Sequence, residues 1–256
     1  MKRGLLAFLL MMTVCLPASA FADAPMKNET VQSCDASQTI THEEAAALLG
    51  VDANSIAGIV PGPFQGVWEV NITVNGKVHL IYVDCSKKFF IQGHIFRLSN
   101  KENLTRARFE ELNPVDVSSI PLNNAIVLGK QSSNKRIIVF TDPTCTFCVK
   151  LHGAIKEAIR KDPEAAFYIM PYPRNSADKA LYEKCQAALC DKSGKILDDI
   201  YAGKEVGPPT CKSNAVDEII RLVERLQIQG TPSMVLPDGR VTSGYRNAED
   251  ILKLLK

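Results

Sequence analysis

Two cysteines three residues apart, Cys145 and Cys148, are the residues of this chain best suited to chemistry. They follow a short apolar and β-branched run over 137–140, which predicts a buried strand, and they open a segment with helical periodicity. Cys145 is therefore expected at the N-terminus of a helix, where unpaired backbone N–H groups and the helix dipole stabilise a thiolate. Cys148 lies about one turn further along, within reach of a disulfide formed at Cys145. This arrangement predicts a thiol–disulfide exchange site.

Cysteines at this spacing also form half of many zinc sites, so metal binding and inert thiols are the alternatives. A structural zinc site needs a second pair of ligands, and the sequence has neither another Cys-x-x-Cys nor a close pair of histidines. We therefore expect a redox site with no metal and no cofactor. His152, four residues after Cys148, is expected on the helix surface, with assistance in proton transfer as the second interpretation.

A proline near the C-terminus supports the redox interpretation. Gly230, Thr231 and Pro232 come directly before a strand-like segment at 233–236. Taken alone, this is an ordinary trans proline that begins a strand. Thioredoxin-type sites instead place a cis-proline beside the reactive cysteine, where the neighbouring backbone can pair with an extended substrate. Because a Cys-x-x-Cys helix precedes it, we expect a cis Thr231–Pro232 bond and assign both residues to substrate binding.

The stretch 140–152, which is Phe-Thr-Asp-Pro-Thr-Cys-Thr-Phe-Cys-Val-Lys-Leu-His, resembles the active-site stretch of the bacterial periplasmic disulfide isomerases, the DsbC/DsbG family. The likeness continues in the same order at 188–192, 207–211 and 230–232. It covers residues 120–256 well and the N-terminal part by the order of elements. The family usually has Gly-Tyr or Pro-Tyr between the cysteines, whereas this chain has Thr146 and Phe147. The difference bears on the redox potential of the cysteine pair and not on the type of reaction.

The resemblance implies a thiol:disulfide interchange enzyme that isomerises or reduces incorrect disulfides in misfolded, exported client proteins. It implies a homodimer whose two arms form a V around an apolar cleft, and a DsbD-type membrane reductase that keeps Cys145 and Cys148 reduced. It also implies a structural disulfide between Cys190 and Cys211, which leaves Cys185 as a buried apolar thiol. The alternatives are a DsbA-like dithiol oxidase, which the extra N-terminal domain argues against, and a DsbG-like chaperone or holdase.

Residues 1–24 predict a Sec-type signal peptide. Lys2 and Arg3 precede an apolar run that is too short to span a bilayer, and a small-x-small motif follows. Cleavage near Ala20 to Ala24 would place the mature protein in the periplasm.

Removal of this segment changes the charge and the cysteine count. Residues 1–20 contain Lys2 and Arg3 and no acidic residue, so cleavage after Ala20 leaves 28 basic and 28 acidic residues. A net charge near zero gives no electrostatic reason to expect binding to nucleic acid or stable association with a membrane. The chain has eight cysteines, of which Cys15 is removed. Seven cysteines in an oxidising compartment favour disulfides, and Cys34 with Cys85 is a candidate second bridge.

The mature length predicts two domains. In residues 25–99, a capped helix at 41–50 precedes two alternating strands on either side of Asn75-Gly76, a hairpin signal, and 88–98 predicts a further strand. An α+β domain of this size buries little apolar surface by itself. We therefore expect it to pair with a second copy of the same domain.

Two further regions complete the predicted fold. Residues 100–119 predict a linker helix solvated by its charges and ended by Asn113-Pro114. Residues 120–256 predict a thioredoxin-like α/β domain with a helical insertion before the Thr-Pro strand. The expected elements are strands at 125–128, 137–140, 166–170 and 240–245, and helices at 176–189, 214–229 and 248–256.

Overall fold

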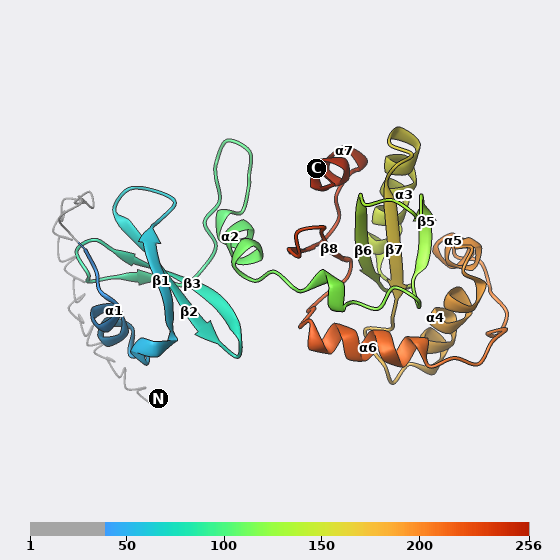
Figure 1. Ribbon diagram of the computed structural model, residues 1–256, viewed down its shortest axis with the longest axis horizontal. Coiled ribbons are helices and arrows are strands. Elements are labelled where there is room, and N and C mark those ends of the chain that lie inside the picture. Colours follow the sequence, from blue (N-terminus) through green and yellow to red (C-terminus); the bar gives the residue numbers. More distant parts are fainter. Residues whose placement is uncertain (1–38, 256) are drawn as a thin grey trace, which may run out of the picture.

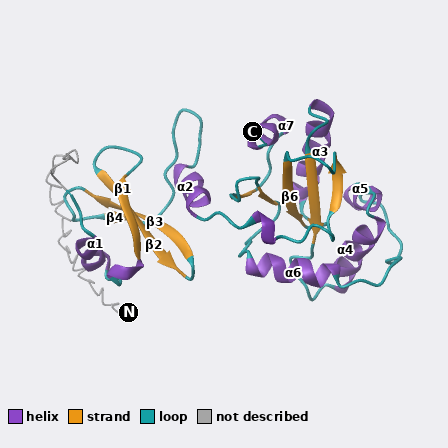
Figure 2. Ribbon diagram, in the orientation of Figure 1, coloured by secondary structure: helices purple, strands orange, loops and turns teal. Residues whose placement is uncertain are grey.

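The computed structural model describes residues 39–255 and contains two separate β-sheets, each with a hydrophobic core of its own (Figure 1). The predicted signal peptide lies outside the described residues. Helices and strands are mixed in both parts of the chain, as Figure 2 shows by colour, so the predicted α+β and α/β fold class is confirmed.

The first sheet is antiparallel, with its four strands in chain order. These strands are β1 (Ile56–Pro61), β2 (Val67–Val74), β3 (Lys77–Asp84) and β4 (Phe90–Ile91). The predicted hairpin joins β2 to β3. Asn75 and Gly76 form its turn with φ of 51° and 76°, the left-handed backbone that a tight two-residue hairpin turn requires and that these two residue types tolerate.

Helix α1 (His42–Leu49) packs its buried alanines against this sheet, and a short 3₁₀ turn (Ala53–Ser55) follows it. Its ends are as predicted: the Thr41 side chain accepts a hydrogen bond from the backbone of Glu44, and Gly50 ends the helix in the left-handed region.

The strand predicted at 88–98 is wrong for most of its length. Only the two residues of β4 pair with β3, and the chain then leaves the sheet. Phe89, Phe90, Phe96 and Leu98 are all exposed, so a longer strand here would gain no burial of these side chains against the residues that the structure describes.

Helix α2 (Leu104–Leu112) packs against the first sheet, whereas the sequence predicted a helix solvated by its charges. Thr105 is hydrogen-bonded to the buried Tyr82 hydroxyl at 2.9 Å, and Arg108 is paired with the buried Glu69 at 3.0 Å. Asn113, just after the helix, exchanges two hydrogen bonds of 2.8 and 2.9 Å with the backbone of Val78. The charged side chains of α2 therefore contact the sheet as well as solvent.

The second sheet has the order β5-β7-β6-β8-β9. Its strands are β5 (Ile126–Gly129), β6 (Arg136–Thr141), β7 (Ala166–Pro171), β8 (Ser233–Val235) and β9 (Val241–Ser243). Only β6 and β7 are parallel, and α3 (Thr146–Lys161) connects them. Nearly every residue of these two strands is buried, so both faces of the sheet are covered.

Five helices surround this sheet, preceded by a short 3₁₀ turn (Val117–Ser119). After α3 come α4 (Lys179–Asp191), α5 (Lys195–Tyr201), α6 (Ala215–Arg225) and α7 (Ala248–Leu254). Helix α3 lies beside α7, and α4 lies beside both α5 and α6 (Figure 1).

The predicted helical insertion is present, with three differences in detail. Helix α4 starts at Lys179, because the Asp178 side chain caps it there. Helix α6 ends at Arg225, and its N-cap residue Asn214 makes no side-chain cap bond. Helix α5 was not predicted.

No helix within residues 39–255 is long and apolar enough to cross a membrane.

Candidate active site

Cys145 is the N-cap residue of α3, directly beyond the end of β6. The turn between them is held by Asp142, whose carboxylate accepts hydrogen bonds from the backbone N–H and the hydroxyl of Thr144 at 2.7 and 2.6 Å. The backbone N–H of Cys145 donates to the Asp142 carbonyl at 3.1 Å. The Cys145 side chain makes no cap hydrogen bond, so its sulfur stands at the positive end of the α3 dipole, which favours its thiolate.

Asp142 is a site residue that the sequence reasoning missed. Its carboxylate is 1% exposed and also accepts from the backbone N–H of Arg174 at 2.9 Å and from the Arg174 guanidinium at 3.4 Å. Burial alone would raise the pKa of Asp142, but the bonds from Thr144 and Arg174 outweigh it and lower that pKa. The carboxylate therefore stays ionised and fixes the turn before Cys145. The position of Asp142 at the end of a predicted strand was the only sequence signal.

Thr231 and Pro232 lie beside Cys145 because β8 pairs with β6, with Ser233 opposite Phe140. The Thr231–Pro232 peptide bond is cis, as expected. The Cys145 thiol donates a hydrogen bond to the Thr231 carbonyl at 3.4 Å. The strand order thus brings together residues that are 86 positions apart in the chain.

The pKa values of the two thiols are shifted in opposite directions. Burial works against ionisation of Cys145, but hydrogen bonds from the Cys148 thiol, from Thr231 and from the backbone N–H groups of Cys148 and Phe147 lower its pKa. Cys148 is 1% exposed, and burial raises its pKa to about 11, although the backbone N–H of Asp142 donates to its sulfur at 3.5 Å. At neutral pH the first thiol is therefore the better nucleophile, and the second stays protonated.

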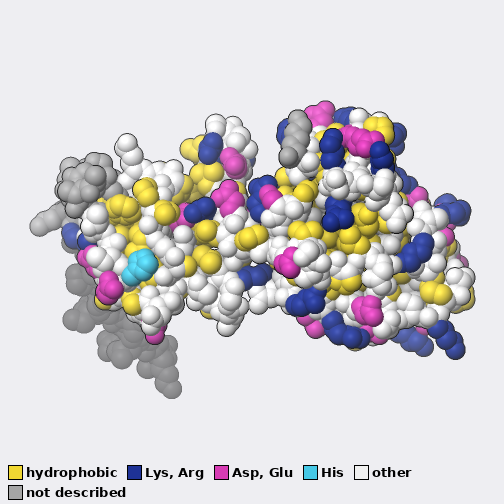
Figure 3. Space-filling view, viewed as in Figure 1, with side chains coloured by type: hydrophobic (Ala, Val, Ile, Leu, Met, Phe, Trp, Pro, Cys, Tyr) yellow, Lys and Arg dark blue, Asp and Glu magenta, His cyan; other side chains and the backbone are white. Residues whose placement is uncertain are grey.

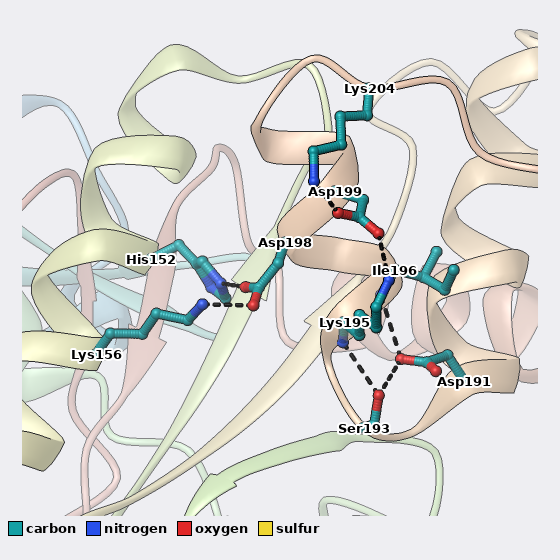
Figure 4. Close-up of polar contacts among 9 residues, drawn as sticks. All are labelled: His152, Lys156, Asp191, Ser193, Lys195, Ile196, Asp198, Asp199 and Lys204. Carbon is teal, nitrogen blue, oxygen red and sulfur yellow. Dashed lines mark hydrogen bonds and ion pairs between the residues drawn. The ribbon is translucent and has the colours of Figure 1, made fainter.

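The expectation that His152 lies on the helix surface is wrong. Its side chain is buried, and Nε2 lies 2.6 Å from a carboxylate oxygen of Asp198 in α5 (Figure 4). Lys156, one turn further along α3, approaches the other oxygen of Asp198 at 2.5 Å. Burial lowers the pKa of His152 despite the carboxylate. Its place four residues after the buried Cys148 was the signal: both fall on the inner face of α3.

The other cysteines occupy three kinds of environment. Cys190 and Cys211 form a disulfide with a Cα–Cα distance of 5.6 Å, which is the pairing that the resemblance implied. Cys185 is a free thiol that is fully buried, and burial raises its pKa. Cys85 is buried, and Cys34 lies outside the described residues, so the Cys34–Cys85 bridge remains a prediction.

Replacing Cys190 and Cys211 together with Ala should lower the free energy of unfolding by about 3 kcal/mol, because the bridge closes a loop of roughly 20 residues. The exchange chemistry at Cys145 should persist. Urea denaturation of the variant and of the parent measures the change, and peptide mapping of the non-reduced parent checks the pairing. A fragment that joins Cys185 to Cys190 would contradict it.

No group of three or more His, Cys, Asp or Glu side chains within residues 39–255 is arranged to hold a metal ion.

Comparison with known proteins agrees with this chemistry. A family model described as "Thioredoxin-like domain" matches residues 122–256, and one described as "Disulfide bond isomerase protein N-terminal domain" matches residues 32–106. The chain is 30% identical over 190 residues to a probable thiol:disulfide interchange protein DsbC of Bordetella avium, covering 73% of this chain and 64% of that protein. It is 28% identical over 218 residues to the thiol:disulfide interchange protein DsbC of Escherichia coli, covering 83% and 85% of the two chains.

Among solved structures, the disulfide interchange protein from Neisseria gonorrhoeae aligns with 53% of this chain and 96% of its own, at 27% identity and a TM-score of 0.45. The two family models together span most of the chain, and each matches one of the two sheets with its helices. The chain therefore belongs to the DsbC family of thiol:disulfide interchange proteins, enzymes built on a thioredoxin-like domain.

Proposed function

We propose that this protein is a dimeric disulfide isomerase of the bacterial periplasm, with Cys145 as its nucleophile and Cys148 as its resolving thiol. The observation that carries the proposal is the different placement of the two thiols: Cys145 is the N-cap residue of α3 and its sulfur lies 3.4 Å from the Thr231 carbonyl beside the cis-proline, whereas Cys148 is 1% exposed. This placement lowers the pKa of Cys145 and raises that of Cys148 to about 11. An enzyme that must hold a client covalently, while the client rearranges, needs a reactive first thiol and a slow second one.

The reaction begins when the Cys145 thiolate attacks a wrong disulfide in a misfolded client. A bond forms between Cys145 and one client sulfur, and the other client sulfur leaves as a thiolate. If a client thiolate then attacks the mixed disulfide, Cys145 is released unchanged and the client has a different pairing. If Cys148 attacks instead, the client leaves reduced and the enzyme is left with a Cys145–Cys148 disulfide.

Thr231 and Pro232 are proposed to bind the client segment that carries the attacked disulfide. Thr231 precedes β8 and lies outside the ladder between β6 and β8, so its backbone is available to an extended peptide. Its carbonyl already points at the Cys145 sulfur at 3.4 Å, where a client sulfur would arrive. Backbone pairing of this kind selects extended, unfolded segments without regard to their side chains.

The N-terminal sheet is proposed as the dimer interface. Its outermost strand β4 and the loop that follows expose large apolar side chains, and Figure 3 shows apolar groups gathered over this part of the molecule. The side chains concerned are Phe89, Phe90, Ile91, Phe96 and Leu98. An unpaired edge strand with an apolar surface is open to pairing with a second copy. We accordingly assign residues 25–99 to dimerisation, 100–119 to a linker and 120–256 to catalysis.

The compartment and the reductant follow from the same chemistry. The predicted signal peptide and the Cys190–Cys211 disulfide both fit an oxidising, exported environment. Each reductive turn leaves the active pair oxidised, so a membrane reductase of the DsbD type is the proposed source of two electrons per turn.

A scrambled client with several disulfides tests this function. The reduced protein should restore the native pairing of such a client at catalytic amounts, and alkylation of Cys145 should abolish this activity. If the alkylated protein still suppresses client aggregation and the unmodified protein does not repair disulfides, the protein is a holdase and the proposal is wrong.

A further inference from the structure

Two serine hydroxyls hold the segment 230–232, which contains the residues proposed to bind the client. Ser233, the first residue of β8, is fully buried, and its hydroxyl donates to the Gly230 carbonyl at 2.7 Å. The hydroxyl of Ser243, the last residue of β9, lies 2.9 Å from that of Ser233. Because Ser233 has one hydroxyl proton and gives it to a carbonyl, it must accept the proton of Ser243. The hydrogen bonds therefore run in one direction, from Ser243 through Ser233 to Gly230.

The backbone at the end of β9 also holds the cis-proline. The N–H of Gly244 donates to the Pro232 carbonyl at 2.8 Å. In an antiparallel ladder, pairs that exchange backbone hydrogen bonds alternate with pairs that do not, so the adjacent pair of Ser233 with Ser243 is of the second kind. The Ser243 carbonyl therefore points away from β8. Since β9 is the outer strand of the second sheet, this carbonyl faces out of the edge of the sheet.

A side chain of α2 binds this outward carbonyl. The Arg106 guanidinium donates to the Ser243 carbonyl at 2.5 Å, across 137 positions in the chain. Its Nε is paired with Glu110, one turn further along α2, at 2.9 Å, so the planar group is fixed by two partners. The bond from Arg106 connects the helix that packs on the first sheet with the strand that holds the client-binding segment (Figure 1).

The β2–β3 hairpin contacts the chain just before the same segment. Lys77 donates through Nζ to the Gln227 carbonyl at 3.4 Å, and the Gln227 side chain donates to the Asn75 carbonyl at 3.5 Å. The N-terminal part of the protein thus touches the chain on both sides of residues 230–232. The bond from Arg106 is shorter than these two and has a charged donor, so we expect it to have the larger effect.

We propose that Arg106 positions the backbone that binds the client: acting through Ser243 and Ser233, it holds residues 230–232 in the conformation that pairs with an extended client segment beside Cys145. The inference rests on the proposed function and deepens it, because it makes a residue outside the catalytic domain part of client recognition. Arg106, Ser233 and Ser243 act on the client through residues 230–232 and are positioning residues.

The physical effect is a preorganised binding segment. Loss of the bond from Arg106 releases the end of β9, which holds Gly230 through the serines and Pro232 through Gly244. A client that pairs with this backbone must then order the segment as it binds, and its affinity falls. A small disulfide without a peptide backbone does not use the segment, so its reaction with Cys145 is expected to stay the same.

Two disulfide substrates separate these effects. One is a short unstructured peptide whose single cysteine is joined to mercaptoethanol, and the other is bis(hydroxyethyl) disulfide. Oxidation of the reduced protein is followed by acid quench and mass spectrometry at increasing substrate concentrations. Arg106→Met should raise the half-saturating concentration of the peptide about threefold to tenfold, the change expected from one hydrogen bond, and leave the limiting rate unchanged. The rate with bis(hydroxyethyl) disulfide should not change.

Arg97→Met is the matched control. It removes the same charge from the chain just before α2, where the Arg97 guanidinium is paired with Glu102 at 3.6 Å. This variant should react with both substrates as the parent protein does.

Ser243 provides a second set of variants that does not depend on Arg106→Met. Ser243→Ala should also raise the half-saturating concentration of the peptide, and Ser243→Thr, which keeps the hydroxyl, should restore it. The effects of Arg106→Met and Ser243→Ala should combine to less than their product, because both act on one segment.

An unchanged half-saturating concentration in Arg106→Met or Ser243→Ala would overturn the inference. So would an equal increase in Arg97→Met, or an equal slowing with both substrates. A parent protein that reacts with neither disulfide would instead contradict the proposed function.

Discussion

Replacing Cys145 with Ala should reduce disulfide exchange by more than about a thousandfold, because the nucleophile is lost and Cys148 is buried and protonated at neutral pH.

Replacing Cys148 with Ala should have a different effect. Cys145 can still attack, but only a client thiol can then resolve the product. Stable mixed disulfides with clients should accumulate and be visible on non-reducing gels.

The pH dependence of alkylation measures the same asymmetry. The rate at Cys145 should rise at a pH below that of an ordinary thiol, since its lowered pKa gives thiolate there, whereas Cys148 should react only as the pH approaches about 11. Cys185→Ala is the control, because this third free thiol is fully buried and its loss should change neither profile. Faster alkylation of Cys148, or client adducts on Cys145→Ala, would reverse the assigned roles.

Charges on the outer strand of the first sheet should separate the dimer. Phe90 and Ile91 are exposed on β4, and the proposed interface buries them. Replacing both with Asp would place two carboxylates in that interface and should weaken association by more than about a hundredfold. The variant should sediment as a monomer, keep simple reductase activity and lose most of its isomerase activity on a client with several disulfides.

Phe64→Asp is the matched control for this experiment. Phe64 is also an exposed phenylalanine of the first domain, but it lies in the loop between β1 and β2 rather than on β4. This variant should remain dimeric and active. If the parent protein sediments as a monomer and has full isomerase activity, the proposal that the N-terminal sheet forms a dimer interface is wrong.

The parts of the site that follow each other in the chain could be predicted from the sequence. A buried strand, a turn and a Cys-x-x-Cys helix are signalled by local patterns alone, and the structure has them as β6 and α3. The hairpin at Asn75-Gly76 is signalled in the same local way. The cis-proline was expected because thioredoxin-type sites place one beside a Cys-x-x-Cys helix. The Cys190–Cys211 pairing required the family resemblance, because spacing alone does not specify the partner of a cysteine.

The parts that depend on distant partners could not be predicted. His152 is buried because Asp198, 46 residues away, offers it a carboxylate, and Asp142 is ionised because Arg174 reaches it across 32 residues. Strand β1 was not predicted either, because it contains Gly58 and Pro61, which are poor signals for a strand. The position of a polar residue on the inner face of a helix indicates that its side chain is buried. The residue that forms its hydrogen bond is identified only in the folded structure.

The redox state of Cys145 and Cys148 in the cell tests the central claim most directly. Cells are quenched in acid, free thiols are alkylated, and the active-site peptide is weighed by mass spectrometry. The Cys190–Cys211 disulfide is the internal control, because it should be oxidised in the same sample. An isomerase predicts that most of the Cys145–Cys148 pair is a dithiol. A pair found mainly as a disulfide, in cells with an intact reductase, would identify a dithiol oxidase and contradict this account.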